Sequence, residues 1–178
     1  IHIEQLDLTN EISISKLTEK INKLDVLVNC AALAKGGVEY RIENFSDVVN
    51  VNLMGTLRIC HSILPKLALS HGNIVNLTSV STKLASSTSP AYASTKSGIE
   101  SLTKSMAACW ATHNVRVNSI APGWIEGNTY DTLTKELEDQ FYLDRIPLKR
   151  LGKPNEVANV ILFLASSYAS YITGATIL

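Results

Sequence analysis

The sequence predicts an α/β fold: a doubly wound parallel sheet with helices on both faces, in a single domain covering residues 1–178. Short apolar, β-branched runs alternate with longer amphipathic runs along the whole chain, and each short run ends in polar or turn-forming residues. The length of 178 residues falls within the usual range of one domain, and the sequence contains no internal repeat or linker.

Five of the apolar runs are expected to be strands. The run at 25–29 is β-branched and apolar enough for a strand that is buried on both faces. The others share its short length and its polar ending. The expected strands are residues 1–6, 25–29, 73–78, 115–120 and 175–178.

The runs between these strands have the periodicity of helices. Ile14, Leu17 and Ile21 recur at helical spacing after a capping residue at Thr9 or Asn10. Proline suits the first turn of a helix and bends a helix interior, which predicts a bend at Pro65. The expected helices are residues 10–24, 44–71, 90–113, 132–141 and 154–165.

The composition excludes several classes of partner. Sixteen basic residues offset sixteen acidic ones, so no excess of positive charge predicts a nucleic acid partner. No apolar run approaches the ~20 residues of a membrane helix, and the first residues lack the features of a signal peptide. Cys30, Cys60 and Cys109 lie in apolar stretches without metal-ligand spacing. We therefore expect reduced cysteines, no metal, no membrane and a cytoplasmic location.

Polar or conformationally special residues follow four of the expected strands, at Asp7, Asn29, Ser79 and the pair Pro122-Gly123. At any single strand end such a residue is common, because turns favour these types. The carboxyl ends of parallel strands share one edge, where open α/β sheets bind ligands. Four together on that edge favour a ligand site.

Tyr92 and Lys96 are four residues apart on an expected helix, so their side chains share one face. The spacing is not specific by itself, but Ser79 ends a strand thirteen residues earlier. At ~4 Å and an effective dielectric of ~20, an ammonium stabilises a phenolate by ~4 kcal/mol, before desolvation opposes it. The arrangement therefore predicts a tyrosine whose pKa is brought toward neutrality for general acid–base catalysis.

The stretch around Ser79, Tyr92 and Lys96 resembles the active-site segment of the classical short-chain dehydrogenase/reductase family. Asn-Cys-Ala-Ala at 29–32 is similar to the family's Asn-Asn-Ala-Gly, and Asn-Val-Asn-Leu-Met-Gly-Thr at 50–56 is similar to its active-site asparagine helix. Later blocks resemble the family in order, at residues 116–123, 148–154 and 171–174.

The resemblance implies a Rossmann-like fold and an oxidoreductase that transfers hydride between NAD or NADP and a carbonyl or secondary alcohol. It implies four catalytic residues. Tyr92 would transfer the proton, and Ser79 would hydrogen-bond the substrate oxygen. Lys96 would tune Tyr92 and bind the nicotinamide ribose. Asn52 would hold a water that links Lys96 to solvent, although a polar residue within a helix is otherwise more often a packing position.

The resemblance also implies cofactor contacts on the adenosine side. Asp7 would contact the adenine, and Asn29 and Ala31 would line the ribose, largely through their backbone. Ala32 stands where the family usually has glycine.

On the nicotinamide side, Tyr92 and Lys96 would be joined by Pro122, Gly123 and the backbone of Ile125. The family usually has a threonine two residues after the position of Ile125, where this sequence has Gly127. That contact is therefore in doubt or displaced to Thr129.

The family begins with a strand, a glycine-rich turn on a helix N-terminus and a second strand, and the sequence contains none of these. That unit would bind the pyrophosphate and select NAD or NADP. Without it the run at 1–6 would stand ~14 Å from the rest of the sheet, because strands lie ~4.8 Å apart. We therefore expect a longer chain, of which this sequence lacks the N-terminal unit and the extreme C-terminus; an intact mass of 19.4 kDa would contradict this.

Two other hypotheses of function stay open. A noncatalytic homologue that acts as a binding or structural protein gains if the phosphate-binding turn is truly absent. A nucleotide-sugar epimerase shares the Tyr-x-x-x-Lys spacing, but such chains need a larger carboxy-terminal substrate region.

Assembly and substrate are less constrained. The helices at 44–71 and 90–113 resemble those that pair subunits in this family, as a tetramer or dimer, but could instead only cover the sheet. Residues 84–89 and 124–142 would line the pocket for a small molecule, and their mixed character fits sugars, steroids or acyl chains alike.

Overall fold

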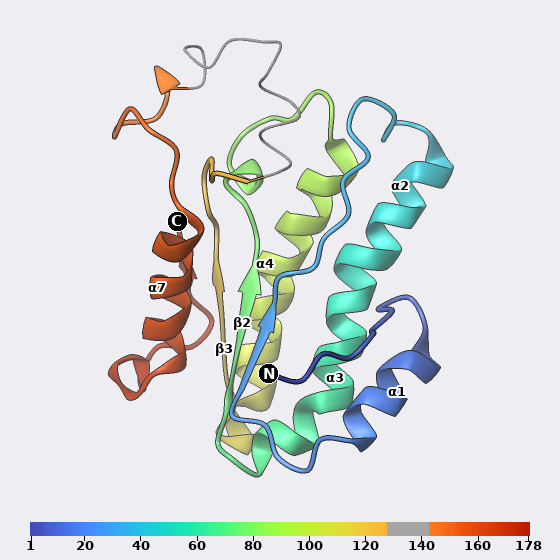
Figure 1. The fold of residues 1–178 in the computed structure, drawn as a ribbon, viewed down its shortest axis with the longest axis vertical. Coiled ribbons are helices and arrows are strands. Elements are labelled where there is room, and N and C mark those ends of the chain that lie inside the picture. Colours follow the sequence, from blue (N-terminus) through green and yellow to red (C-terminus); the bar gives the residue numbers. More distant parts are fainter. Residues whose placement is uncertain (128–142) are drawn as a thin grey trace.

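A four-stranded parallel sheet forms the centre of the computed structural model, which describes residues 1–127 and 143–178 (Figure 1). The sheet order is β1-β2-β3-β4. Asn29 pairs with Asn76, and Leu77 pairs with Ile120, so β1, β2 and β3 end at one edge. The strands are β1 (Val26–Asn29), β2 (Asn73–Leu77), β3 (Arg116–Ile120) and β4 (Thr176–Ile177).

Helices cover both faces of the sheet (Figure 1). Ile74 and Val117 point into an apolar cluster with α1, α3 and α4, whereas Val75 and Ile120 point into a second cluster with α7. The alternation follows from the period of two in a strand. The helices are α1 (Glu11–Glu19), α2 (Ile42–Val49), α3 (Gly55–Ala68), α4 (Pro90–Trp110) and α7 (Pro154–Ala165).

The α/β class and the parallel sheet are confirmed, and four expected strands are present within one or two residues. The strand expected at residues 1–6 is wrong. The segment has no regular structure, because no strand in the described ranges lies beside it to complete a hydrogen-bonded ladder. Leu6 and Leu8 nevertheless pack on the first apolar cluster.

The single long helix expected at 44–71 is divided by a π-helical turn, η1 (Asn50–Met54), which lies between α2 and α3. Pro65 lies inside α3, so the interruption comes a few turns earlier than the proline. Such π turns are frequent at functional sites, and this one carries Asn52. The helix expected at 132–141 lies outside the described residues. Within the described ranges, no helix has the length and hydrophobicity of a membrane span.

Candidate active site

The end of β2 and the first two turns of α4 bring the expected catalytic residues together. Ser79 follows the strand, and its Oγ accepts a hydrogen bond from the Ser81 backbone N at 3.1 Å, which caps the short 3₁₀ turn η2 (Val80–Thr82). Pro90 opens α4, where its missing N–H costs nothing. Tyr92 therefore lies in the first turn, and Lys96 lies one turn later on the same face.

Three side chains meet at this point. The Ser79 hydroxyl lies close enough to the Tyr92 phenol to lower the pKa of that phenol. The Nζ of Lys96 lies 5.5 Å from the centroid of the Tyr92 ring and donates to the Leu77 carbonyl at 2.6 Å. Lys96 is only 3% exposed, which is rare for an ammonium. The carbonyl at the end of β2 thus holds the lysine over the face of the tyrosine ring.

Burial controls the acidity of both groups. It raises the pKa of Tyr92 above its ordinary value, and the nearby Ser79 hydroxyl opposes that change. Burial also lowers the pKa of Lys96 to about 8. The expected lowering of the Tyr92 pKa is therefore wrong for this structure, because Lys96 sits over the ring face and desolvation of the phenolate dominates.

Asn52 joins the π turn to two other segments. Its Oδ1 accepts from the Leu33 N at 2.7 Å, while its Nδ2 donates to the Leu33 O at 2.8 Å and to Thr95 Oγ1 at 3.1 Å. Both amide hydrogens thus have protein partners. Asn52 lies against the turn of α4 between Tyr92 and Lys96, and its role in holding a relay water stays a prediction.

The residues expected around the adenosine lie close together. Asn29 and Ala31 line a cavity of about 150 Å³, together with Leu6 and Leu8, the neighbours of Asp7. The Asn29 amide donates to Asn76 Oδ1 at 2.8 Å, so its side chain is committed to the sheet.

The Asp7 carboxylate is exposed at the start of this region. Its Oδ1 accepts from the Thr9 hydroxyl at 2.7 Å and from the Thr9 N at 2.8 Å, and these hydrogen bonds lower the pKa of Asp7. The Oδ1 atom of Asp7 thus stabilises the turn before α1.

The residues expected around the nicotinamide follow β3. The Pro122 carbonyl accepts from the Val80 N at 3.0 Å, which sets this segment beside Ser79. A side chain at Gly123 would meet none of the described residues within 4 Å, so among these residues the backbone there is open to a ligand. Ile125 forms an isolated bridge with Gly152, and Thr129 lies outside the described residues.

Sequence reasoning did not identify Glu39 in this region. Its carboxylate is fully buried and accepts a hydrogen bond from the Tyr92 backbone N at 2.9 Å. No local pattern marks it, because Glu39 and Tyr92 are 53 residues apart.

Comparison with known proteins decides the family. Residues 3–178 match the family model described as "Enoyl-(Acyl carrier protein) reductase". The chain is 37% identical over 180 residues to 3-oxoacyl-[acyl-carrier-protein] reductase FabG of Thermotoga maritima, across 99% of this chain and 72% of that one. The chain belongs to the short-chain dehydrogenase/reductase family.

Two further similarities agree with this membership. The FabG of Aquifex aeolicus is 40% identical over 183 residues, across 99% of this chain and 73% of its own length. The structure titled "Crystal structure of gox2181" has a TM-score of 0.90 at 30% identity, and covers 97% of this chain and 71% of that one. As a short-chain dehydrogenase/reductase, the protein is an oxidoreductase that transfers hydride between NAD or NADP and a carbonyl or secondary alcohol, and this membership favours the catalytic hypothesis over the noncatalytic one.

The residues at the sheet edge suit the nicotinamide riboside of this cofactor. Within the described part of the chain, Lys96 donates one hydrogen bond, to Leu77, and an ammonium has three hydrogens. The others are available for ribose hydroxyls. The open backbone at Gly123 gives a flat ring room to approach.

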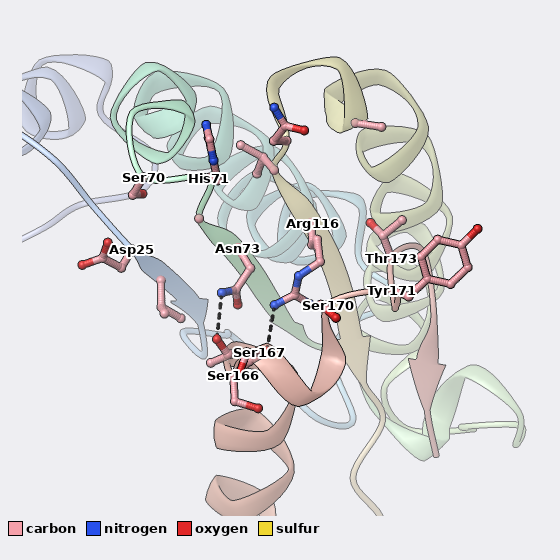
Figure 2. Close-up of a pocket in the computed structure, with 16 residues that line it drawn as sticks. Asp25, Ser70, His71, Asn73, Arg116, Ser166, Ser167, Ser170, Tyr171 and Thr173 are labelled. Carbon is pink, nitrogen blue, oxygen red and sulfur yellow. Dashed lines mark hydrogen bonds between the residues drawn. The ribbon is translucent and has the colours of Figure 1, made fainter.

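A second cavity, of about 790 Å³, lies at the opposite edge of the sheet (Figure 2). Its lining includes the first residues of three strands, Val26, Asn73 and Arg116. Arg116 donates to the Leu164 O at 2.9 Å, and Asn73 Nδ2 donates to the Ala165 O at 3.2 Å. These groups cap the last carbonyls of α7, and the cavity contains none of the expected catalytic residues.

Proposed function

We propose that this protein reduces 3-oxoacyl thioesters carried by acyl carrier protein, with Tyr92 as the proton donor. The observation that carries the catalytic part is the meeting of Ser79, Tyr92 and Lys96 at the end of β2. The substrate class is supported by the names of the relatives, which are 3-oxoacyl-[acyl-carrier-protein] reductases.

Tyr92 is suited to give a proton. Burial raises its pKa, so the phenol keeps its proton at neutral pH until charge develops on a carbonyl oxygen beside it. The Ser79 hydroxyl, which lies beside the phenol, would hydrogen-bond the same oxygen and stabilise the developing charge. The bound nicotinamide supplies the hydride.

Lys96 would hold the ribose and return a proton to Tyr92. Its pKa of about 8 lets it release and regain a proton near neutrality. Asn52 would hold the relay water, and the remaining cofactor contacts would be those the family resemblance implies. They are Asp7, Asn29, Ala31, Pro122, Gly123, Ile125 and Thr129.

A substrate panel with both reduced cofactors tests the proposal. We expect an acetoacetyl thioester to be reduced at least about tenfold more efficiently, as kcat/KM, than a keto sugar or a keto steroid. NADH and NADPH are each used with every substrate, and the preferred one assigns the cofactor. Reduction of only the sugar or the steroid would overturn the substrate class.

The protein would act as a homo-oligomer, a dimer or tetramer, in the cytoplasm. The pairing would use the helical segments at 44–71 and 90–113, as the family resemblance implies. Cys30, Cys60 and Cys109 are free thiols, two of them exposed, which suits a reducing compartment. Light scattering on the purified protein tests the assembly.

A further inference from the structure

Glu39 is buried where hydrophobicity alone would expose it. Its exposed fraction is 0%, whereas its neighbours Val38 and Tyr40 are 42% and 71% exposed. Burying a carboxylate costs free energy unless hydrogen bonds or charges compensate it. An apolar residue on each side stays in solvent while the acid goes inside, so specific bonds hold Glu39 in place.

Those bonds come from two backbone amides. Oε1 accepts from the Lys35 N at 2.8 Å, and Oε2 accepts from the Tyr92 N at 2.9 Å. Tyr92 is the third residue of α4, where an N–H has no partner within the helix. The side chain of the N-cap residue Ser89 does not cap an N–H of the helix. Glu39 therefore supplies the cap from another segment, and its charge suits a helix N-terminus.

The carbonyl of Tyr92 is tied to the same segment by a second route. It accepts from Thr95 Oγ1 at 2.8 Å, and Thr95 Oγ1 accepts from Asn52 Nδ2 at 3.1 Å. Asn52 binds both the N and the O of Leu33. The loop at 30–39 is thus connected to both sides of the Tyr92 main chain.

We propose that Glu39 is a positioning residue for proton transfer, because its carboxylate fixes the Tyr92 main chain to the loop at 30–39. The phenol then keeps its place relative to Ser79 and to Ala31, which lies on this loop. Glu39 touches neither substrate nor cofactor and acts through Tyr92. The inference rests on the proposed role of Tyr92.

The charges around this pair predict how the pH profile responds. Cys30, Glu39 and Lys96 face Tyr92, and the negative charge of Glu39 contributes to its raised pKa. Lys35 presents only its backbone N to Glu39, since its Nζ pairs with Asp47 at 2.5 Å. Removing the Glu39 charge should lower the pKa of Tyr92. The pH above which reduction fails, as Tyr92 loses its proton, should then move down.

Two variants distinguish the effect of the Glu39 charge from the effect of its side-chain length. Glu39→Gln keeps the length but loses the charge and one acceptor. We expect kcat to fall about 10- to 100-fold with a small change in substrate KM, and the upper pH limit to move to lower pH. Glu39→Asp keeps the charge but cannot reach both amides, so kcat should fall while the pH limit stays. Glu43→Gln, an exposed position in the first turn of α2, is the matched control and should behave as the wild type.

Values are taken per folded site, from circular dichroism and active-site titration. If Glu39→Gln does not fold, the kcat of Glu39→Asp decides. Wild-type kcat and pH limit in the folded variants would overturn the inference, because a purely structural role changes only the amount of folded protein. Tyr92→Phe is measured in parallel. If Tyr92→Phe stays active, the proposed function fails as well. If Tyr92→Phe is inactive but Glu39→Gln has the kcat and pH limit of the wild type, only the positioning role is overturned.

Discussion

Burial sets the chemistry of the two central residues, Tyr92 and Lys96. Each is disfavoured in its charged form, since the pKa of the phenol is raised and that of the ammonium is lowered to about 8. The sequence predicted that Ser79, Tyr92 and Lys96 would meet, because strand length and helical spacing determine their placement. It could not predict the direction of the Tyr92 pKa, because that depends on how deeply the folded chain encloses the phenol.

Lys96 makes the stability of the protein depend on pH. With a folded pKa of about 8 and an unfolded pKa near its usual 10.5, the unfolded chain binds more protons between these values. Stability therefore rises with pH across this window, and the penalty of burying the charge is complete below pH 8. In Lys96→Met this group is absent. We expect the wild type to gain about 2 kcal/mol in free energy of unfolding, relative to Lys96→Met, between about pH 7.5 and 10.

Urea unfolding of both proteins across this range measures the difference. A constant difference would show that Lys96 titrates at its ordinary pKa in the folded protein. A difference that changes in the opposite direction would show that its folded pKa is raised.

At the scale of helices and strands, the connection between α3 and β2 requires two backbone segments to lie very close together. Gly72 connects α3 to β2, and a Cβ there would lie 2.6 Å from the Asp25 O and 2.9 Å from a Leu67 methyl carbon. The neighbouring backbone would have to move to admit any side chain. The sequence shows this glycine between a helix and a strand, but only the folded chain shows what packs against it.

Gly72→Ala should therefore destabilise the protein by about 2 kcal/mol. Gly123→Ala is the control, because an added Cβ there meets none of the atoms in residues 1–127 and 143–178 within 4 Å and should leave stability nearly unchanged. Thermal unfolding of both variants checks the pair. Equal melting temperatures would show that the α3–β2 junction can relax around a methyl group.

Two expected elements show where sequence patterns are not sufficient to predict secondary structure. The run at 1–6 has the composition of a strand, yet a strand needs a neighbour, and none of the described segments provides one. The π turn at Asn50–Met54 contains neither proline nor glycine, so it carries no sequence signal that would divide the expected helix into α2 and α3. Pairing and local hydrogen bonding, rather than propensity, decided both cases.

At the scale of the whole molecule, the parallel sheet collects distant segments at one edge. Alternating strands and helices predicted this, since parallel strands joined by helices all end on the same side. The sequence could not predict contacts between segments that are far apart along the chain. The hydrogen bond from Tyr92 to Glu39 spans 53 residues and exists only because the loop after β1 passes the start of α4.

Single-turnover hydride transfer in Tyr92→Phe, measured with saturating reduced cofactor, tests whether Tyr92 is the proton donor. The phenol oxygen is the only group removed, so the ring keeps its packing over Lys96. We expect the rate to fall at least about 100-fold, while cofactor affinity from nicotinamide fluorescence stays within about threefold. An unchanged rate would contradict the assignment of Tyr92 as the proton donor.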